Sequence, residues 1–127
     1  MALAKRVKNG GSYYKGYPLS VASATGAYTL AIIPTTNNFA MNGLAVTPMV
    51  YGTGDSFDIY HMATTASTGG VIVKTLANSV PNIGGGVSTM LDFASLELVN
   101  PGESVRFVYN NVATQAMSVY VTIETLR

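Results

Sequence analysis

Cysteine and tryptophan are absent from this sequence, and histidine occurs once, as His61. Without cysteine the chain can form neither a disulfide nor a thiolate metal site, and one histidine leaves a transition-metal site short of ligands. Charge is also scarce, because 10% of the residues are charged while 48% are hydrophobic. Disordered chains show the opposite balance. The composition therefore excludes global disorder, and we expect no metal and no other cofactor.

Long apolar runs are missing as well. No segment approaches the ~20 apolar residues that a membrane helix requires, so we expect no membrane association. Lys5, Arg6 and Lys8 interrupt the first residues, which therefore lack the apolar stretch of a secretory signal. A length of 127 residues fits one domain with one apolar core.

The few charges are unevenly placed along the chain. No acidic residue precedes Asp55, and all the basic residues of that first part lie before residue 16. Glycines, a proline and three tyrosines accompany them up to residue 18. We interpret residues 1–18 as an extended basic arm and residues 19–127 as one folded body. The residues of the arm predicted to bind a partner are Lys5, Arg6, Lys8, Tyr13, Tyr14, Lys15 and Tyr17.

The body alternates apolar and polar residues with a period of two, which is typical of half-buried β-strands. Pro48 indicates that its strand lies at a sheet edge or is bent, and residues 78–86, with one proline and three consecutive glycines, predict a loop. About eight short strands predict an all-β fold, a single antiparallel β-sandwich or jelly-roll-like barrel. The strand candidates are residues 28–33, 44–51, 56–62, 71–76, 103–109 and 118–126. Residues 88–99 are the one weak helix candidate, but residues 95–99 alternate, so we predict a strand there as well.

The best candidate for chemistry is the segment from Asp55 to His61. On a strand, one face of this segment carries Asp55, Phe57, Ile59 and His61. Asp58 lies on the other face, so it cannot pair with His61 through strand geometry alone. A hydrolase triad would need His61 as its only base and a hydroxyl, such as that of Ser56, brought from elsewhere. We therefore interpret His61 as a packed or interface histidine and expect that the protein is not an enzyme.

Other patterns that resemble functional sites lack their required context. The glycines at 52 and 54 and at 84–86 precede no helical pattern, so they do not form phosphate loops. The six acids are scattered singly, which gives paired-carboxylate chemistry no local support. Asp55 and Asp58 lack the spacing of a calcium loop. We expect no catalytic residues, no cofactor-binding residues and no metal ligands.

The basic arm admits three interpretations. Its lysines and tyrosines could follow a nucleic-acid backbone and stack on bases. A net charge of +1 is nevertheless small for a protein that depends on phosphate contacts. The arm could also be a soluble tail, or it could anchor the protein to an acidic protein surface. Anchoring to a protein is the interpretation that we favour.

The segment Leu96–Asn110 has a strand–turn–strand pattern in which Pro101, Gly102 and Glu103 form the turn. A polar loop and the strand predicted for residues 118–126 follow it. This pattern resembles the end of small all-β virion proteins of tailed phages. The low charge, the missing cysteine and the basic start are similar to those of capsid decoration or cement proteins.

The resemblance implies a structural virion protein that binds and stabilises the outer surface of a phage capsid. Its implied partner is the major capsid protein or another virion protein, and its implied location is the capsid surface after synthesis in the host cytoplasm. We also expect a homo-oligomer, most readily a trimer, because charge is scarce and several strands carry apolar residues on both faces. In the last strand Val119, Val121 and Ile123 alternate with Tyr120 and Leu126, so neither face is purely of the solvent-exposed type. The alternatives are a tail, adaptor or receptor-binding β-domain of a virion and a small β-barrel that binds nucleic acid.

Overall fold

The computed structural model describes residues 12–34 and 39–126, and these residues form eight β-strands. Within them, no helix is long and apolar enough to cross a membrane. The strands are β1 (Ser12–Val21), β2 (Gly26–Ile32), β3 (Phe39–Pro48), β4 (Ser56–Met62), β5 (Ile72–Pro81), β6 (Thr89–Val99), β7 (Ser104–Asn111) and β8 (Met117–Leu126).

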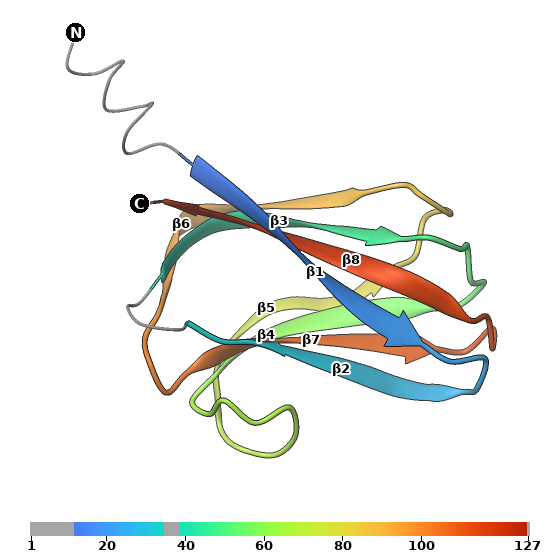
Figure 1. Ribbon diagram of the computed structural model, residues 1–127, viewed down its shortest axis with the longest axis horizontal. Coiled ribbons are helices and arrows are strands. Elements are labelled where there is room, and N and C mark those ends of the chain that lie inside the picture. The colour runs from blue at the N-terminus through green and yellow to red at the C-terminus, as the bar shows by residue number, and fades with distance from the viewer. Residues whose placement is uncertain (1–11, 35–38, 127) are drawn as a thin grey trace, which may run out of the picture.

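The strands form two four-stranded sheets that stack face to face (Figure 1). Sheet A has the order β1-β8-β3-β6, and sheet B has the order β2-β7-β4-β5. The pairing is antiparallel and nested: β1 pairs with β8, β2 with β7, β3 with β6 and β4 with β5. This is the arrangement of a jelly roll, in which one long antiparallel ribbon is rolled into two sheets. The all-β prediction of about eight strands is confirmed.

The apolar core lies between the two sheets. In β4 and β7 buried side chains alternate with partly exposed ones, except that Met62 at the end of β4 and Ser104 at the start of β7 are buried as well. Phe57 and Phe107 pack there with ring centroids 5.5 Å apart. The buried apolar side chains of the core are Leu19, Val21, Ile32, Met41, Leu44, Val46, Phe57, Ile59, Val99, Val105, Phe107, Tyr109, Met117, Val119, Val121 and Ile123.

Of the two alternatives predicted from Pro48, a strand at a sheet edge or a bent strand, the edge position was wrong. β3 lies inside sheet A, between β8 and β6. Pro48 is tolerated there because it is the last residue of the strand and lies beyond the last residue of β3 that pairs with β6, which is Val46. Its carbonyl accepts a hydrogen bond from Gly86 N (2.7 Å).

The loop predicted for residues 78–86 begins later than expected. β5 continues to Pro81, because its pairing with β4 shifts register and accommodates an irregular backbone. Ser79 has a positive φ of 53°, and its N–H donates a hydrogen bond of 2.7 Å to the Asp58 carboxylate. Pro81 lies at the end of a strand whose outer edge has no neighbour in the described sheet.

A bulge at Asn42 changes which residues of β3 point inward. Met41 pairs with Thr125, but the next pair is Gly43 with Glu124, so Asn42 is an extra residue. Met41 is buried before the bulge, and Leu44 and Val46 are buried after it. A side chain at Gly43 would not fit, because a Cβ atom there would lie 2.6 Å from the Leu91 carbonyl oxygen.

The folded body includes part of the segment interpreted as an arm. β1 begins at Ser12, and residues 12–18 pair with β8. Alternate residues of β1 point into the sandwich, where Leu19 and Val21 are buried and Tyr17 packs against the core. Residues 1–11 of the arm lie outside the described residues.

Candidate functional site

His61 is buried near the end of β4 and lies between two glutamates. Only 4% of the surface of this residue is exposed. Nδ1 lies 2.7 Å from Glu97 Oε2, and Nε2 lies 2.8 Å from Glu103 Oε1. Glu97 comes from β6 in the opposite sheet, and Glu103 from the turn before β7. Lys74 of β5 donates a further hydrogen bond of 3.3 Å to Glu97 Oε1. The cluster of these four residues therefore links sheet A to sheet B.

Both ring nitrogens of His61 can donate at once only when the imidazole carries two protons. The backbone N–H of Asn100 donates to Glu103, and this bond, together with the hydrogen bond from His61, lowers the pKa of the Glu103 carboxyl. With both nitrogens engaged by carboxylates, neither is placed to activate a hydroxyl. The two carboxylates also lie on opposite sides of the ring, and residues 12–34 and 39–126 contain no group of three or more His, Cys, Asp or Glu that could hold a metal ion. The interpretation of His61 as a packed histidine is confirmed.

The glutamates of this cluster were not identified from the sequence. The alternation in residues 95–99 suggests that Leu96 and Leu98 point inward. The structure instead buries Glu97 and Val99 and leaves Leu96 46% and Leu98 49% exposed. Hydrogen bonds of Glu97 to His61 and Lys74 offset the cost of burying a carboxylate. As a consequence, Leu96 and Leu98 lie exposed on the outside of the edge strand β6.

The predicted arm residues divide into three groups. Lys5, Arg6 and Lys8, with the side chain of Tyr13, lie outside the described part of the chain. Tyr14 is 68% exposed on the outer face of sheet A, and its hydroxyl donates a hydrogen bond of 3.3 Å to Glu124. Lys15 and Tyr17 point the other way, and the Lys15 ammonium lies 5.3 Å from the centre of the Tyr17 ring. Among the arm residues whose side chains the structure describes, Tyr14 therefore lies on the opposite face of β1 from Lys15 and Tyr17.

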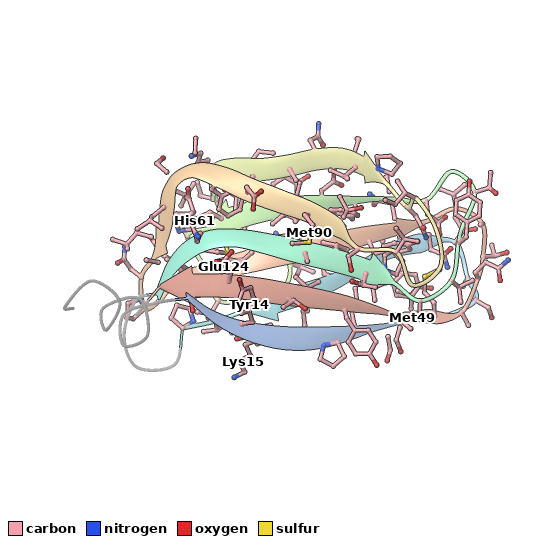
Figure 2. The ribbon with its side chains drawn as sticks, turned by 90° about the horizontal axis from the view of Figure 1, so that it is seen from above. Tyr14, Lys15, Met49, His61, Met90 and Glu124 are labelled. Atoms are coloured by element: carbon pink, nitrogen blue, oxygen red, sulfur yellow. The ribbon has the colours of Figure 1, made fainter. Side chains whose placement is uncertain are left out.

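A groove crosses the outer face of sheet A, with a volume of about 220 Å³. It follows from the register, which places small residues beside large ones. One row across the sheet is Tyr14, Glu124, Gly43 and Asp92, and the next row is Gly16, Thr122, Ala45 and Met90. Figure 2 looks onto this face and labels Tyr14, Glu124 and Met90 across it. We call this feature the sheet A groove; its lining residues are Tyr14, Leu44, Ala45, Thr47, Ser88, Met90, Asp92, Thr122 and Glu124.

The sheet A groove is apolar in the middle and acidic at one end. The negative charge of Glu124 is the largest cause of the raised pKa of the Tyr14 hydroxyl, and Asp92 adds to it. Both carboxylates belong to the same cross-strand row. Met90 and Tyr14, two of the most exposed large apolar side chains, border the groove. This combination suits a cationic segment with aliphatic stems rather than an anion.

The free edges of the two sheets expose further apolar side chains. β5 is one of the two edge strands of sheet B and β6 is one of the two edge strands of sheet A, and the Lys74–Glu97 hydrogen bond connects them. Val71, Ile72 and Val73 are exposed at the start of β5, at the same end as Leu96 and Leu98 of β6. Exposed apolar edge strands are sites where sheets bind other chains.

Comparison with known proteins gives matches at the level of structure. No protein-family model matches the sequence, and a search of curated proteins finds no match. A chain of the cyanophage Pam1 capsid asymmetric unit matches with a TM-score of 0.53 and 16% identity, over 92% of this chain and 85% of that chain. The VP2 subviral particle of infectious bursal disease virus matches with a TM-score of 0.41 and 12% identity, over 91% of this chain and 32% of that chain. The infectious bursal disease virus Gt strain matches with a TM-score of 0.40 and 12% identity, over 87% and 32%. The protein thus shares its all-β fold with a chain of a phage capsid.

Proposed function

We propose that this protein is a structural component of a virion, a decoration or cement protein that binds and stabilises the outer surface of a phage capsid. The observation that carries the proposal is the match to a chain of a phage capsid asymmetric unit, which spans nearly the whole of both chains. The low charge and the exposed apolar edges at β5 and β6 support it, because both favour a surface that meets other protein. The proposed location is the capsid surface.

A catalytic function has little support from the described residues. The single histidine is engaged by Glu97 and Glu103 through both ring nitrogens. We therefore propose a role without catalysis. Nucleic-acid binding is also disfavoured. Asp92 and Glu124 place negative charge on the outer face of sheet A, close to the start of β1, and this charge repels a phosphate backbone.

The first expected result concerns copy number in purified particles. If the protein decorates a capsid lattice, quantitative mass spectrometry of gradient-purified virions should find it in numbers comparable with the major capsid protein. A few copies per particle would instead place it in the tail, in an adaptor or in a receptor-binding structure. The major capsid protein in the same sample provides the internal standard, so the ratio does not depend on particle yield.

The second expected result is a trimer in solution, held together in part by the exposed edge at β5 and β6. Light scattering at micromolar concentration should give the trimer mass for the parent protein and a smaller mass for Leu98→Lys, because a lysine charge on an edge strand opposes association. Val112→Lys is the matched control, since Val112 is also exposed but lies in the loop between β7 and β8. A monomer mass for the parent protein would contradict the proposed trimer.

The basic arm is the proposed attachment to the larger partner. Its charges, Lys5, Arg6, Lys8 and Lys15, would speed encounter with an acidic capsid surface. Its tyrosines would supply buried ring area, and Tyr14 is the one whose described side chain is most available for this. Tyr17 already packs against the core of its own chain, so we expect it to contribute less.

A further inference from the structure

The sheet A groove has the charge and shape to hold a basic extended segment. Asp92 and Glu124 lie in one cross-strand row, and the small side chains of the neighbouring row leave room beside them. Thr122 and Ala45 form the floor of that second row, and Met90 forms its far end. A lysine or arginine side chain could place its aliphatic stem on this floor and its charge against a carboxylate.

The chain itself contains one segment with matching chemistry. Residues 1–11 carry Lys5, Arg6 and Lys8 and no acid. They enter the fold at Ser12, two residues before Tyr14, which borders the groove. Gly10 and Gly11 directly precede β1, and glycine readily adopts the backbone conformations of a tight reversal.

The length of this segment also fits. From β1 to β6, sheet A spans three strand spacings, about 14 Å. The six residues from Arg6 to Ser12 reach up to about 20 Å when extended, so Arg6 can reach Asp92 on the far strand. Lys8, four residues before Ser12, reaches up to about 14 Å and so can meet Glu124 on the adjacent strand.

We propose that the sheet A groove binds residues 1–11 of the same chain, with Lys8 against Glu124 and the Lys5–Arg6 pair against Asp92. The inference goes beyond the proposed function and does not depend on it. It means that the free protein holds its basic segment on its own acidic face. A capsid surface would then compete with the groove for the same three charges.

The test uses the full chain in solution and a spin label. Because the sequence has no cysteine, Val7→Cys provides a single attachment point between Arg6 and Lys8 and preserves both charges. Methionine methyl signals report the position of the label. Met90 lies in the groove, whereas Met49 is also exposed but follows the far end of β3 (Figure 2). Met49 lies about 20 Å along the strand from the Gly43 row, so it is the matched control methyl.

We expect the oxidised label to remove the Met90 signal and leave the Met49 signal, with reduction of the label restoring Met90. Asp92→Asn combined with Glu124→Gln should return the Met90 signal, as should about 1 M salt, where the Debye length falls to about 3 Å. Asp58→Asn removes one negative charge from the opposite sheet and should have no effect.

Two results would overturn the proposal. The first is equal loss of the Met90 and Met49 signals, or loss of neither. The second is loss of the Met90 signal in a mixed sample, in which one population of the protein carries the spin label but no isotope and the other carries the isotope but no spin label. Loss of the signal in that sample means that the bound segment comes from another copy. The methionine signals of the reduced sample show whether each variant has folded. A variant that has not folded is excluded from the comparison.

Discussion

Replacing His61 by alanine is expected to lower the free energy of unfolding by about 3 kcal/mol or more. The substitution leaves the buried carboxylate of Glu97 with only Lys74, and it leaves two glutamates on either side of an empty space. Removing the hydrogen-bond partner of a buried carboxylate is costly because the negative charge stays buried without compensation. The link between β4 of sheet B and β6 of sheet A is lost at the same time. Equilibrium urea unfolding, followed by far-ultraviolet circular dichroism, measures the change.

Lys74→Ala is the control for the His61 variant, because Lys74 contacts the same glutamate but has an exposed side chain. An exposed ion pair contributes about 0.2–1 kcal/mol, so this variant should remain close to the parent protein. Acid provides a second readout. The pKa of Glu103 is lower in the folded state than in the unfolded state, so its contribution is present above the unfolded pKa and is lost as the pH falls through the folded pKa. The parent protein should therefore lose stability in acid more steeply than the His61 variant, and equal slopes would contradict this account of the cluster.

Replacing Asp55 by alanine is expected to lower the free energy of unfolding by about 4 kcal/mol, because several buried donors lose their acceptor. Asp55 is 2% exposed and receives three hydrogen bonds. They come from the Tyr109 hydroxyl at 2.7 Å, from Val112 N at 2.6 Å and from Ala113 N at 2.9 Å. These bonds fix the loop after β7 to the start of β4. Thermal and urea unfolding should both report the loss.

Tyr109→Phe separates the contribution of the Tyr109 hydroxyl from the contributions of the two backbone N–H groups that also donate to Asp55. It removes the hydroxyl that donates to Asp55 and accepts from Asn82 (2.8 Å), while the two backbone donors keep their acceptor. We expect a smaller loss of about 1.5–3 kcal/mol, in line with one hydrogen bond to a charged group. A loss for Asp55→Ala no larger than for Tyr109→Phe would show that the bonds to Val112 and Ala113 contribute little.

The fold class was predictable because period-two alternation survives wherever one strand face is buried. β4 shows this most clearly: its observed bounds, Ser56–Met62, equal the predicted ones. β1 was missed because glycine, proline and basic residues interrupt its pattern, although its inward side chains continue the core. The bulge at Asn42 was equally invisible, since it depends on pairing with β6 and β8, which lie far away in the sequence.

The candidate sites were harder to predict for a related physical reason. His61 was identified from its position on an apolar strand face, but its partners Glu97 and Glu103 lie 36 and 42 residues away in the sequence. The alternation of residues 95–99 gave the wrong orientation, because it placed Leu96 and Leu98 inward and Glu97 outward. The sheet A groove depends on the alignment of four strands, so no local pattern in the sequence predicts it. The interpretation of arm residues as partner-binding remains a prediction.

The nested pairing of the strands determines the order in which the chain can fold during synthesis. β8 is made after the other seven described strands, yet it lies inside sheet A and pairs with both β1 and β3. Because synthesis proceeds at roughly 5–20 residues per second, β8 is completed about 5–20 s after β1. β1 has no partner strand during this interval. Lys15 and Pro18 in β1 hinder pairing with other chains during this interval, since a charge and a missing N–H both weaken an open strand edge. The β4–β5 hairpin needs no late strand, so we expect it to form while the rest of the chain is still being made.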